Sequence, residues 1–259
     1  MKKKKTVYYN DPLNDDFAGT KITRKDLPKN FLFYHSNPIW KFFSFILYYA
    51  IAVPVIFLFL KIAYHVKVVG KKNIRHLKGG YFVYGNHTQI IDAFTGQLFA
   101  SRRRKGYIVA DPDATSIPGI RGLLSMLGVI PIPTSSEEHV RFKEAIGKHI
   151  RKGHVVTIYP EAHIWPYCTH IRPFTEASFV YPCELNVPVV GMVMTYRQRR
   201  FFKNARPYPT IHLSRPFYPN DSLSLPDRKL ALRNHVYEYF LDIASDEDNV
   251  EYIAYRKAK

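Results

Sequence analysis

The sequence predicts an α/β fold: a mostly parallel central sheet flanked by helices, with an N-terminal membrane-anchoring helical segment. Three observations support this prediction. Short apolar runs rich in Val, Ile and Tyr alternate with longer mixed segments, those segments carry apolar residues near helical spacing, and one long uncharged stretch lies near the N-terminus. With 259 residues, 46% of them hydrophobic, the chain can bury a sizeable core. We divide it into residues 1–30, 31–64 and 65–259.

Residues 1–30 are polar and charged, with several Asp and Asn. Such a composition buries little apolar surface. We therefore expect a polar arm that lies on the surface or is only partly ordered.

Residues 31–64 contain nineteen consecutive uncharged residues between Lys41 and Lys61. A helix of this length is about long enough to cross a ~30 Å hydrocarbon core. The alternative is a buried helix of a soluble protein, but such a helix is rarely apolar on every side over this length. Aromatic residues cluster near both ends of the stretch, as at a membrane interface. We predict a membrane anchor.

The charges around the anchor do not indicate a crossing direction, because basic residues precede and follow it. Both flanks would prefer the cytoplasmic side. Pro54 lies in the middle and can kink or break a helix. We therefore predict a bent or hairpin-like insertion that returns to the same face, and a membrane-associated protein whose main domain lies on the cytoplasmic face.

The main domain, residues 65–259, shows alternating strand and helix patterns. Apolar runs rich in β-branched and aromatic residues predict strands, and amphipathic stretches predict helices. The predicted strands are 66–70, 81–85, 106–110, 128–132, 154–160, 187–196 and a late one around 210–218; the predicted helices are 88–103, 137–153 and about 227–244.

The net charge of +17 indicates an anionic partner. The basic stretches interleaved with aromatic residues carry no recognised nucleic-acid motif, so we expect an anionic membrane surface and not nucleic acid. Only two cysteines occur, without a C-x-x-C pair, which favours a reducing compartment. His163, Cys168 and His170 lack the paired short spacings of zinc sites, so we expect no metal and no cofactor.

His87 and Asp92 form the pattern H-x-x-x-x-D directly after the predicted strand 81–85. In a regular helix, residues five apart point about 140° away from each other. The two can meet if His87 lies in a turn and the helix begins at Thr88. The carboxylate would then accept the Nδ1 proton, leaving Nε2 to remove a proton from a hydroxyl. In a chain with eleven histidines the pattern alone is weak, but catalytic groups often follow such strands.

Four blocks in order, NHTQIID (86–92), PGIRGLLSMLGVIPIPT (118–134), YPEAHIWP (159–166) and VPVVGMV (187–193), resemble the lysophospholipid acyltransferase family of the 1-acylglycerol-3-phosphate type. The resemblance implies direct transfer of a fatty acyl group from acyl-CoA or acyl carrier protein to a hydroxyl of a lysolipid acceptor, without an acyl-enzyme. It also implies that His87 is the general base, that Asp92 orients it and that Glu161 organises the acceptor side. The candidate substrate-binding residues are Asn86, Gly128, Glu161, His163 and Arg172.

The second and third blocks depart from the family pattern. Pro131 and Thr134 stand at its phenylalanine and arginine positions, and the run 162–164 (Ala-His-Ile) replaces Gly-Thr-Arg. Both arginines that would hold an acceptor phosphate are therefore missing, although guanidinium is the group best suited to that contact. Either other bases replace them or the acceptor is not a simple glycerol phosphate. The candidate replacements are Arg121, Arg141, His163 and Arg172.

The resemblance thus identifies residues 65–259 as an acyltransferase domain of phospholipid biosynthesis. We expect an apolar groove for the acyl chain between the sheet and the anchor, opening toward the bilayer. Four alternatives stay open: an inactive basic membrane-binding protein with the same fold, acyl transfer to a non-phosphorylated acceptor, a thioesterase in which water replaces the acceptor, and a nucleic-acid binder that uses the charge of +17.

Overall fold

The computed structural model describes residues 5–19, 27–28, 30–112 and 120–258. Its main feature is a seven-stranded sheet with the strand order β2-β8-β7-β3-β6-β4-β5. The five strands from β7 to β5 run parallel, whereas β8 is antiparallel to β7 and parallel to β2. The strands are β2 (Lys67–Val69), β3 (Tyr81–Gly85), β4 (Gly106–Ala110), β5 (Val129–Pro131), β6 (Val155–Ile158), β7 (Val189–Arg197) and β8 (Tyr208–Phe217). The predicted fold class is confirmed.

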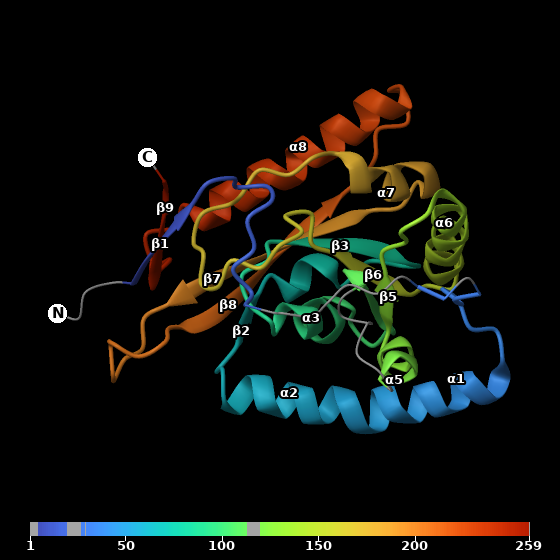
Figure 1. Ribbon diagram of the computed structural model, residues 1–259, viewed down its shortest axis with the longest axis horizontal. Coiled ribbons are helices and arrows are strands. Elements are labelled where there is room, and N and C mark those ends of the chain that lie inside the picture. Colours follow the sequence, from blue (N-terminus) through green and yellow to red (C-terminus); the bar gives the residue numbers. More distant parts are fainter. Residues whose placement is uncertain (1–4, 20–26, 29, 113–119, 259) are drawn as a thin grey trace.

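Helices cover both faces of the sheet (Figure 1). One face packs against α6 (Ser136–Arg151), the short pair η4 (Ala177–Phe179) and α7 (Val180–Leu185), and α8 (Leu225–Ala244). The other face packs against α3 (Asp92–Thr95), the π-helical η3 (Gly96–Ala100) and η2 (Lys71–Ile74). Side chains along β3 point alternately to the two faces of the sheet. Phe82 and Tyr84 pack in the core on the α6 and α8 side, and Tyr81 and Val83 pack in the core on the α3 and η3 side. β3 is therefore buried on both faces, which explains its continuous apolar run.

The N-terminal arm is more integrated than the sequence suggested. In its described part, β1 (Lys5–Tyr9) pairs in parallel with β9 (Ile253–Lys257), and the two lie side by side in Figure 1. Aromatic residues of the arm, Tyr9 and Phe17, pack against Trp165. These residues lie at the surface, as one form of the prediction has it, but they are ordered by a strand from the other end of the chain. Residues 1–4, 20–26 and 29 lie outside the described part.

The predicted anchor forms one continuous helix made of α1 (Pro38–Phe45), the π-helical η1 (Ile46–Ala52) and α2 (Val53–Ile62). The predicted hairpin is wrong. Pro54 is accommodated at the second position of α2, directly after the π-helical turn. There Val53 donates to the carbonyl of Tyr48, five residues back. The wider turn relieves the clash that a proline ring makes with the preceding turn of a regular α-helix.

This helix lies lengthwise along the domain (Figure 1). Its inner side is docked on α5 (Arg121–Met126) and β4: Ser44 Oγ donates to the Met126 carbonyl at 2.7 Å, and the Gly106 N–H donates to Tyr48 Oη at 3.0 Å. Its outer side is apolar and exposed, with Phe42 61% and Val55 62% accessible. Within the described residues it is the one helix long and apolar enough to cross a membrane.

Candidate functional site

His87 and Asp92 meet at the carboxyl end of β3. His87 Nδ1 lies 3.1 Å from Asp92 Oδ2. The Asp92 side chain is 1% exposed and that of His87 15% exposed. Nε2 makes no hydrogen bond within the described residues, so it is the ring nitrogen left to face an incoming group.

Asp92 also organises the turn that carries His87. Its Oδ2 accepts the backbone N–H groups of Thr88 at 2.7 Å and Gln89 at 2.8 Å. The helix begins at Asp92 and not at Thr88 as predicted. The hydroxyl of Thr88 accepts from Tyr196 Oη at 2.7 Å, so Thr88 is held to β7 and does not cap a helix. His87 and Asp92 therefore meet within a turn that the Asp92 carboxylate stabilises through its hydrogen bonds to the backbone.

Tyr159, which sequence reasoning passed over, fixes the plane of the imidazole. Its ring is stacked on that of His87, with centroids 4.5 Å apart and 18° between the planes. Its hydroxyl donates to the Asp92 carbonyl at 2.5 Å. Burial, with a smaller contribution from Asp92, raises the pKa of Tyr159, which keeps the phenol protonated as a donor. A Cβ on Gly85 would lie 2.7 Å from this ring, so glycine there makes room for the stack. The sequence signal that could have identified Tyr159 is its position directly before Pro160 in the third block.

Glu161 and Arg172 form a buried ion pair beside His87. Glu161 Oε2 accepts the backbone N–H of His87 at 3.0 Å and Arg172 Nη2 at 2.9 Å, while Oε1 accepts the Arg172 N–H at 3.0 Å. Arg172 is 1% exposed, and its guanidinium lies 4.9 Å from the Trp165 ring centroid. Arg172 is thus buried against Glu161 and Trp165, while its Nε and Nη1 have no hydrogen-bond partner among the described residues.

Two other candidates lie near this pair. The side chain of Asn86 is buried and exchanges two hydrogen bonds with the backbone of Met194 in β7, at 2.7 and 3.0 Å, so it ties the turn to the neighbouring strand. His163 follows Glu161 in the same loop, is partly exposed, and its carbonyl accepts a hydrogen bond from Arg172. Of these two, only His163 presents side-chain surface.

Gly128 lies away from this cluster. It precedes β5 at the amino ends of the parallel strands, whereas His87 follows the carboxyl end of β3. Its φ is +93°, and a Cβ there would lie 2.6 Å from the Gly106 carbonyl oxygen. Thr134, at the family's arginine position, belongs to the N-terminal cap of α6, where its N–H donates to Glu138 at 3.0 Å. Gly128 therefore lies at the opposite edge of the sheet from the His87 cluster, whereas Thr134 follows the carboxyl end of β5. Residues 118–119 of that block lie outside the described part.

The remaining candidate bases, Arg121 and Arg141, belong to α5 and α6 and are partly exposed.

Comparison with known proteins agrees with this arrangement. The profile of the family described as Acyltransferase matches residues 65–195, just over half of the chain and the region that holds the whole His87 cluster. Comparison with the curated proteins found no match.

Among solved structures, the chain is similar to the crystal structure of the 1-acyl-sn-glycerophosphate (LPA) acyltransferase of Thermotoga maritima. The TM-score is 0.54 at 17% identity, and the match covers 80% of this chain and 89% of that one. At this identity the likeness establishes a common fold. Because the family profile matches more than half of the chain, including the His87 turn and the Glu161 loop, the chain belongs to the acyltransferase family.

Proposed function

We propose that the protein transfers a fatty acyl group from the thioester of acyl-CoA or acyl carrier protein to a hydroxyl of a lysophospholipid or related glycerolipid. The observation that carries the proposal is the His87–Asp92 contact of 3.1 Å, with the carboxylate held by two backbone N–H groups. This arrangement fixes Nδ1–H toward Asp92 and leaves Nε2 as a base. A side-chain nucleophile is not required.

In the proposed reaction, Nε2 of His87 removes the proton of the acceptor hydroxyl as its oxygen attacks the thioester carbonyl carbon. The C–S bond then breaks, the thiolate leaves and takes the proton from the imidazolium, and the products are an ester and a free thiol. Asp92 stabilises the imidazolium during this sequence. The stacked ring of Tyr159 limits rotation of the imidazole.

The acceptor side supports two candidate substrates. Thr134 and Ile164 stand at the two arginine positions of the family pattern, so neither position supplies a guanidinium. Arg172, one of the proposed replacements, is buried in the Glu161 pair. Among the proposed replacements, His163 adjoins Glu161 and has exposed side-chain surface. An acceptor phosphate would therefore contact His163. The same observation favours, as second candidate, an acceptor without a phosphate monoester.

We also propose that the apolar outer side of α1–η1–α2 lies in the membrane, with the domain on the cytoplasmic face. The exposed residues Phe42, Val55 and Ile62 support the first part. Basic residues on both sides of the helix support the second.

The test is thiol release by purified full-length protein from acyl-CoA and acyl carrier protein donors, with phosphorylated and non-phosphorylated lysolipid acceptors, compared with His87→Ala. Acceptor-dependent release that disappears in His87→Ala supports the proposal, and the preferred acceptor decides between the two candidates. Release without an acceptor would indicate a thioesterase. No release with any pair, while both proteins bind anionic vesicles equally, would favour an inactive membrane-binding protein.

A further inference from the structure

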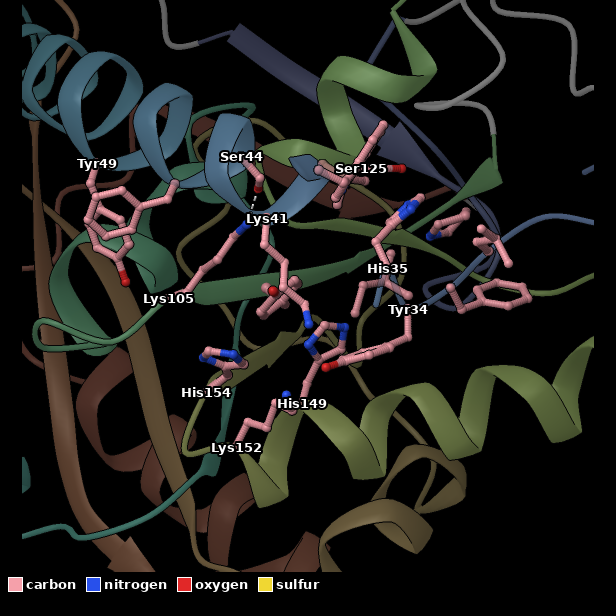
Figure 2. A pocket seen from close by; sticks show the side chains of 18 of the residues that line it. Tyr34, His35, Lys41, Ser44, Tyr49, Lys105, Ser125, His149, Lys152 and His154 are labelled. Carbon is pink, nitrogen blue, oxygen red and sulfur yellow. Dashed lines mark hydrogen bonds between the residues drawn. The ribbon is translucent and has the colours of Figure 1, made fainter. Parts of the chain in front are cut away.

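A cavity of about 550 Å³ lies between the anchor helix and the domain, away from the His87 cluster. Its walls come from α1, the segment 31–35, the C-terminal end of α6, β5 and the residues just before β4 and β6. Figure 2 shows Lys41 from α1 and His149 from α6 pointing into it from opposite sides. It occupies the place expected for an acyl groove, but its lining includes none of the residues of the His87 cluster.

The lining is basic and aromatic, and it contains no aspartate or glutamate among the described residues that form it. An anion would therefore meet attraction from several sides and repulsion from no lining carboxylate. The cations are Lys41, Arg103, Lys105 and Lys152. The three lining histidines, His35, His149 and His154, have a pKa lowered first of all by burial and contribute polar ring surface.

Lys105 is a partly buried cation with neutral partners. Its Nζ donates to Ser44 Oγ at 2.5 Å and to the Met126 carbonyl at 2.9 Å. It also lies 5.3 and 5.2 Å from the ring centroids of Tyr48 and Tyr107. Burial lowers the pKa of Lys105 to about 8. A buried cation is costly unless an anion accompanies it, and no lining residue supplies one.

His149 gives this wall an aromatic surface and no charge. It is 4% exposed, and its ring lies against that of Tyr107, with centroids 3.8 Å apart. Burial, followed by the neighbouring His154, lowers the pKa of His149 to about 3, although a hydrogen bond to the backbone of Phe33 acts in the opposite direction. The ring is therefore neutral at pH 7, and the charge that would attract an anion comes from the lysines and Arg103.

The position of the cavity indicates where such an anion comes from. Trp40, stacked on His35 with centroids 4.1 Å apart, and Phe45 line the cavity from the anchor helix, whose outer side is apolar and exposed. Arg103 lines both this cavity and an open basic cluster beside it. That cluster is formed by Lys71, Lys72, Arg75, Arg102, Arg103 and Arg104. A molecule with an anionic head and an apolar chain, arriving from the bilayer, matches this lining.

We propose that this cavity binds the phosphate head group of an anionic membrane phospholipid, at a site separate from His87. The head group lies between Lys105 and the rim cations Lys41 and Lys152, and the acyl chains pass along the aromatic side chains of α1 toward the membrane. This proposal concerns binding and does not depend on whether His87 acts in acyl transfer.

The test titrates full-length protein in a nonionic detergent with dihexanoyl-phosphatidic acid below its critical micelle concentration. The fluorescence of Trp40 reports binding, and Trp40→Phe identifies its contribution, because Trp165 is the one other tryptophan in the sequence. We expect saturable binding that weakens about tenfold in Lys105→Met and in the double variant Lys41→Gln/Lys152→Gln, since each loses charge-assisted hydrogen bonds. Lys203→Gln, an exposed lysine in the β7–β8 loop, and His87→Ala should bind as the wild type does.

The double rim variant keeps the test valid if Lys105→Met unfolds. Equal affinity for dihexanoyl-phosphatidylcholine, or unchanged affinity in the lysine variants, overturns the proposal. Displacement of the lipid by equimolar inorganic phosphate would assign the cavity to free phosphate instead. Competition of the lipid with the acceptor in thiol release that is lost in Lys105→Met would make the cavity part of the substrate site and overturn its separateness, whereas competition that persists in Lys105→Met reflects product binding at His87 and leaves the cavity separate.

Discussion

The two edges of the central sheet treat charge in opposite ways. At the carboxyl edge, two buried acidic side chains contact bases: Asp92 meets His87 at 3.1 Å and Glu161 meets Arg172 at 2.9 Å. At the amino edge, the cavity under α1 gathers four cations, and no carboxylate is among its described lining residues. Short contacts to fixed partners hold the first set in one geometry. The second set lacks an internal counter-ion and is therefore suited to an external one.

The two edges therefore suit different tasks. The His87 turn holds its groups in a fixed geometry, as a reaction requires, and the cavity under α1 presents charge, as the binding of an anion requires. Preorganised groups act in a transition state without rearranging, and the His87 turn has that character. The cavity has the character of a binding site, because its lysines contact only neutral groups among the described lining residues. Each prediction below breaks or sharpens one side of this contrast.

The largest effect is expected from Asp92→Asn, which breaks the pairing at the carboxyl edge. An asparagine oxygen can still accept the N–H groups of Thr88 and Gln89, but it cannot stabilise an imidazolium. We expect kcat to fall by about 10²–10⁴, with KM nearly unchanged. Steady-state thiol release measures this. A proportional loss of folded protein, seen by circular dichroism, would show that Asp92 is only structural.

Arg172→Met should destabilise the protein by about 3–5 kcal/mol, because it leaves the buried carboxylate of Glu161 without its cation. Urea unfolding measures this. The double variant Glu161→Gln/Arg172→Met removes both charges and should recover part of the loss. If Arg172 instead binds substrate, the single variant would keep its stability and raise KM for the acceptor.

Gly128→Ala should cost about 2–3 kcal/mol, because φ is +93° and the new Cβ would lie 2.6 Å from a backbone oxygen. Thermal unfolding measures the loss. Below the unfolding temperature, kcat/KM should change little, since Gly128 lies at the amino edge. If KM rises and stability is unchanged, Gly128 contributes to substrate binding, as the sequence resemblance implied.

Much of this arrangement could be predicted from sequence. The strands of the parallel sheet and the meeting of His87 with Asp92 follow from local patterns and their order. The pairing of β1 with β9 could not be predicted, because it joins the two ends of the chain. The anchor helix continues past Pro54 because a π-helical turn precedes it, and amino-acid composition does not predict such a turn. The burial of Arg172 is also a tertiary property, since exposure is the usual state of arginine.

A smaller effect is expected at Lys105, whose pKa in the folded protein is lowered to about 8 by burial. Between about pH 8 and 10 the unfolded chain still holds this proton while the folded protein has released it. Stability therefore rises with pH across this window, by roughly 1–3 kcal/mol. Urea unfolding from pH 7.5 to 9.5 should show this rise in the wild type and not in Lys105→Met. Saturating dihexanoyl-phosphatidic acid should reduce it, because a bound anion favours the charged amine. If the wild type and Lys105→Met show the same dependence of stability on pH, Lys105 is not a buried cation without a counter-ion.

The smallest effect concerns the loop that carries Glu161. Ala162 has φ +63°, a left-handed conformation that costs a non-glycine residue about 1 kcal/mol, and the family's third block has glycine at this place. Ala162→Gly should therefore stabilise the protein by about 0.5–1 kcal/mol, whereas the matched change Ala231→Gly within α8 should destabilise it by a similar amount. Urea unfolding of both variants measures the difference. If Ala162→Gly is more stable and keeps its activity, the strain at Ala162 is not needed to place Glu161, and the Arg172 pair alone holds this carboxylate. If it is more stable but slower, the strained backbone helps to hold Glu161 against the His87 N–H, and the carboxyl edge depends on backbone conformation as well as on paired charge.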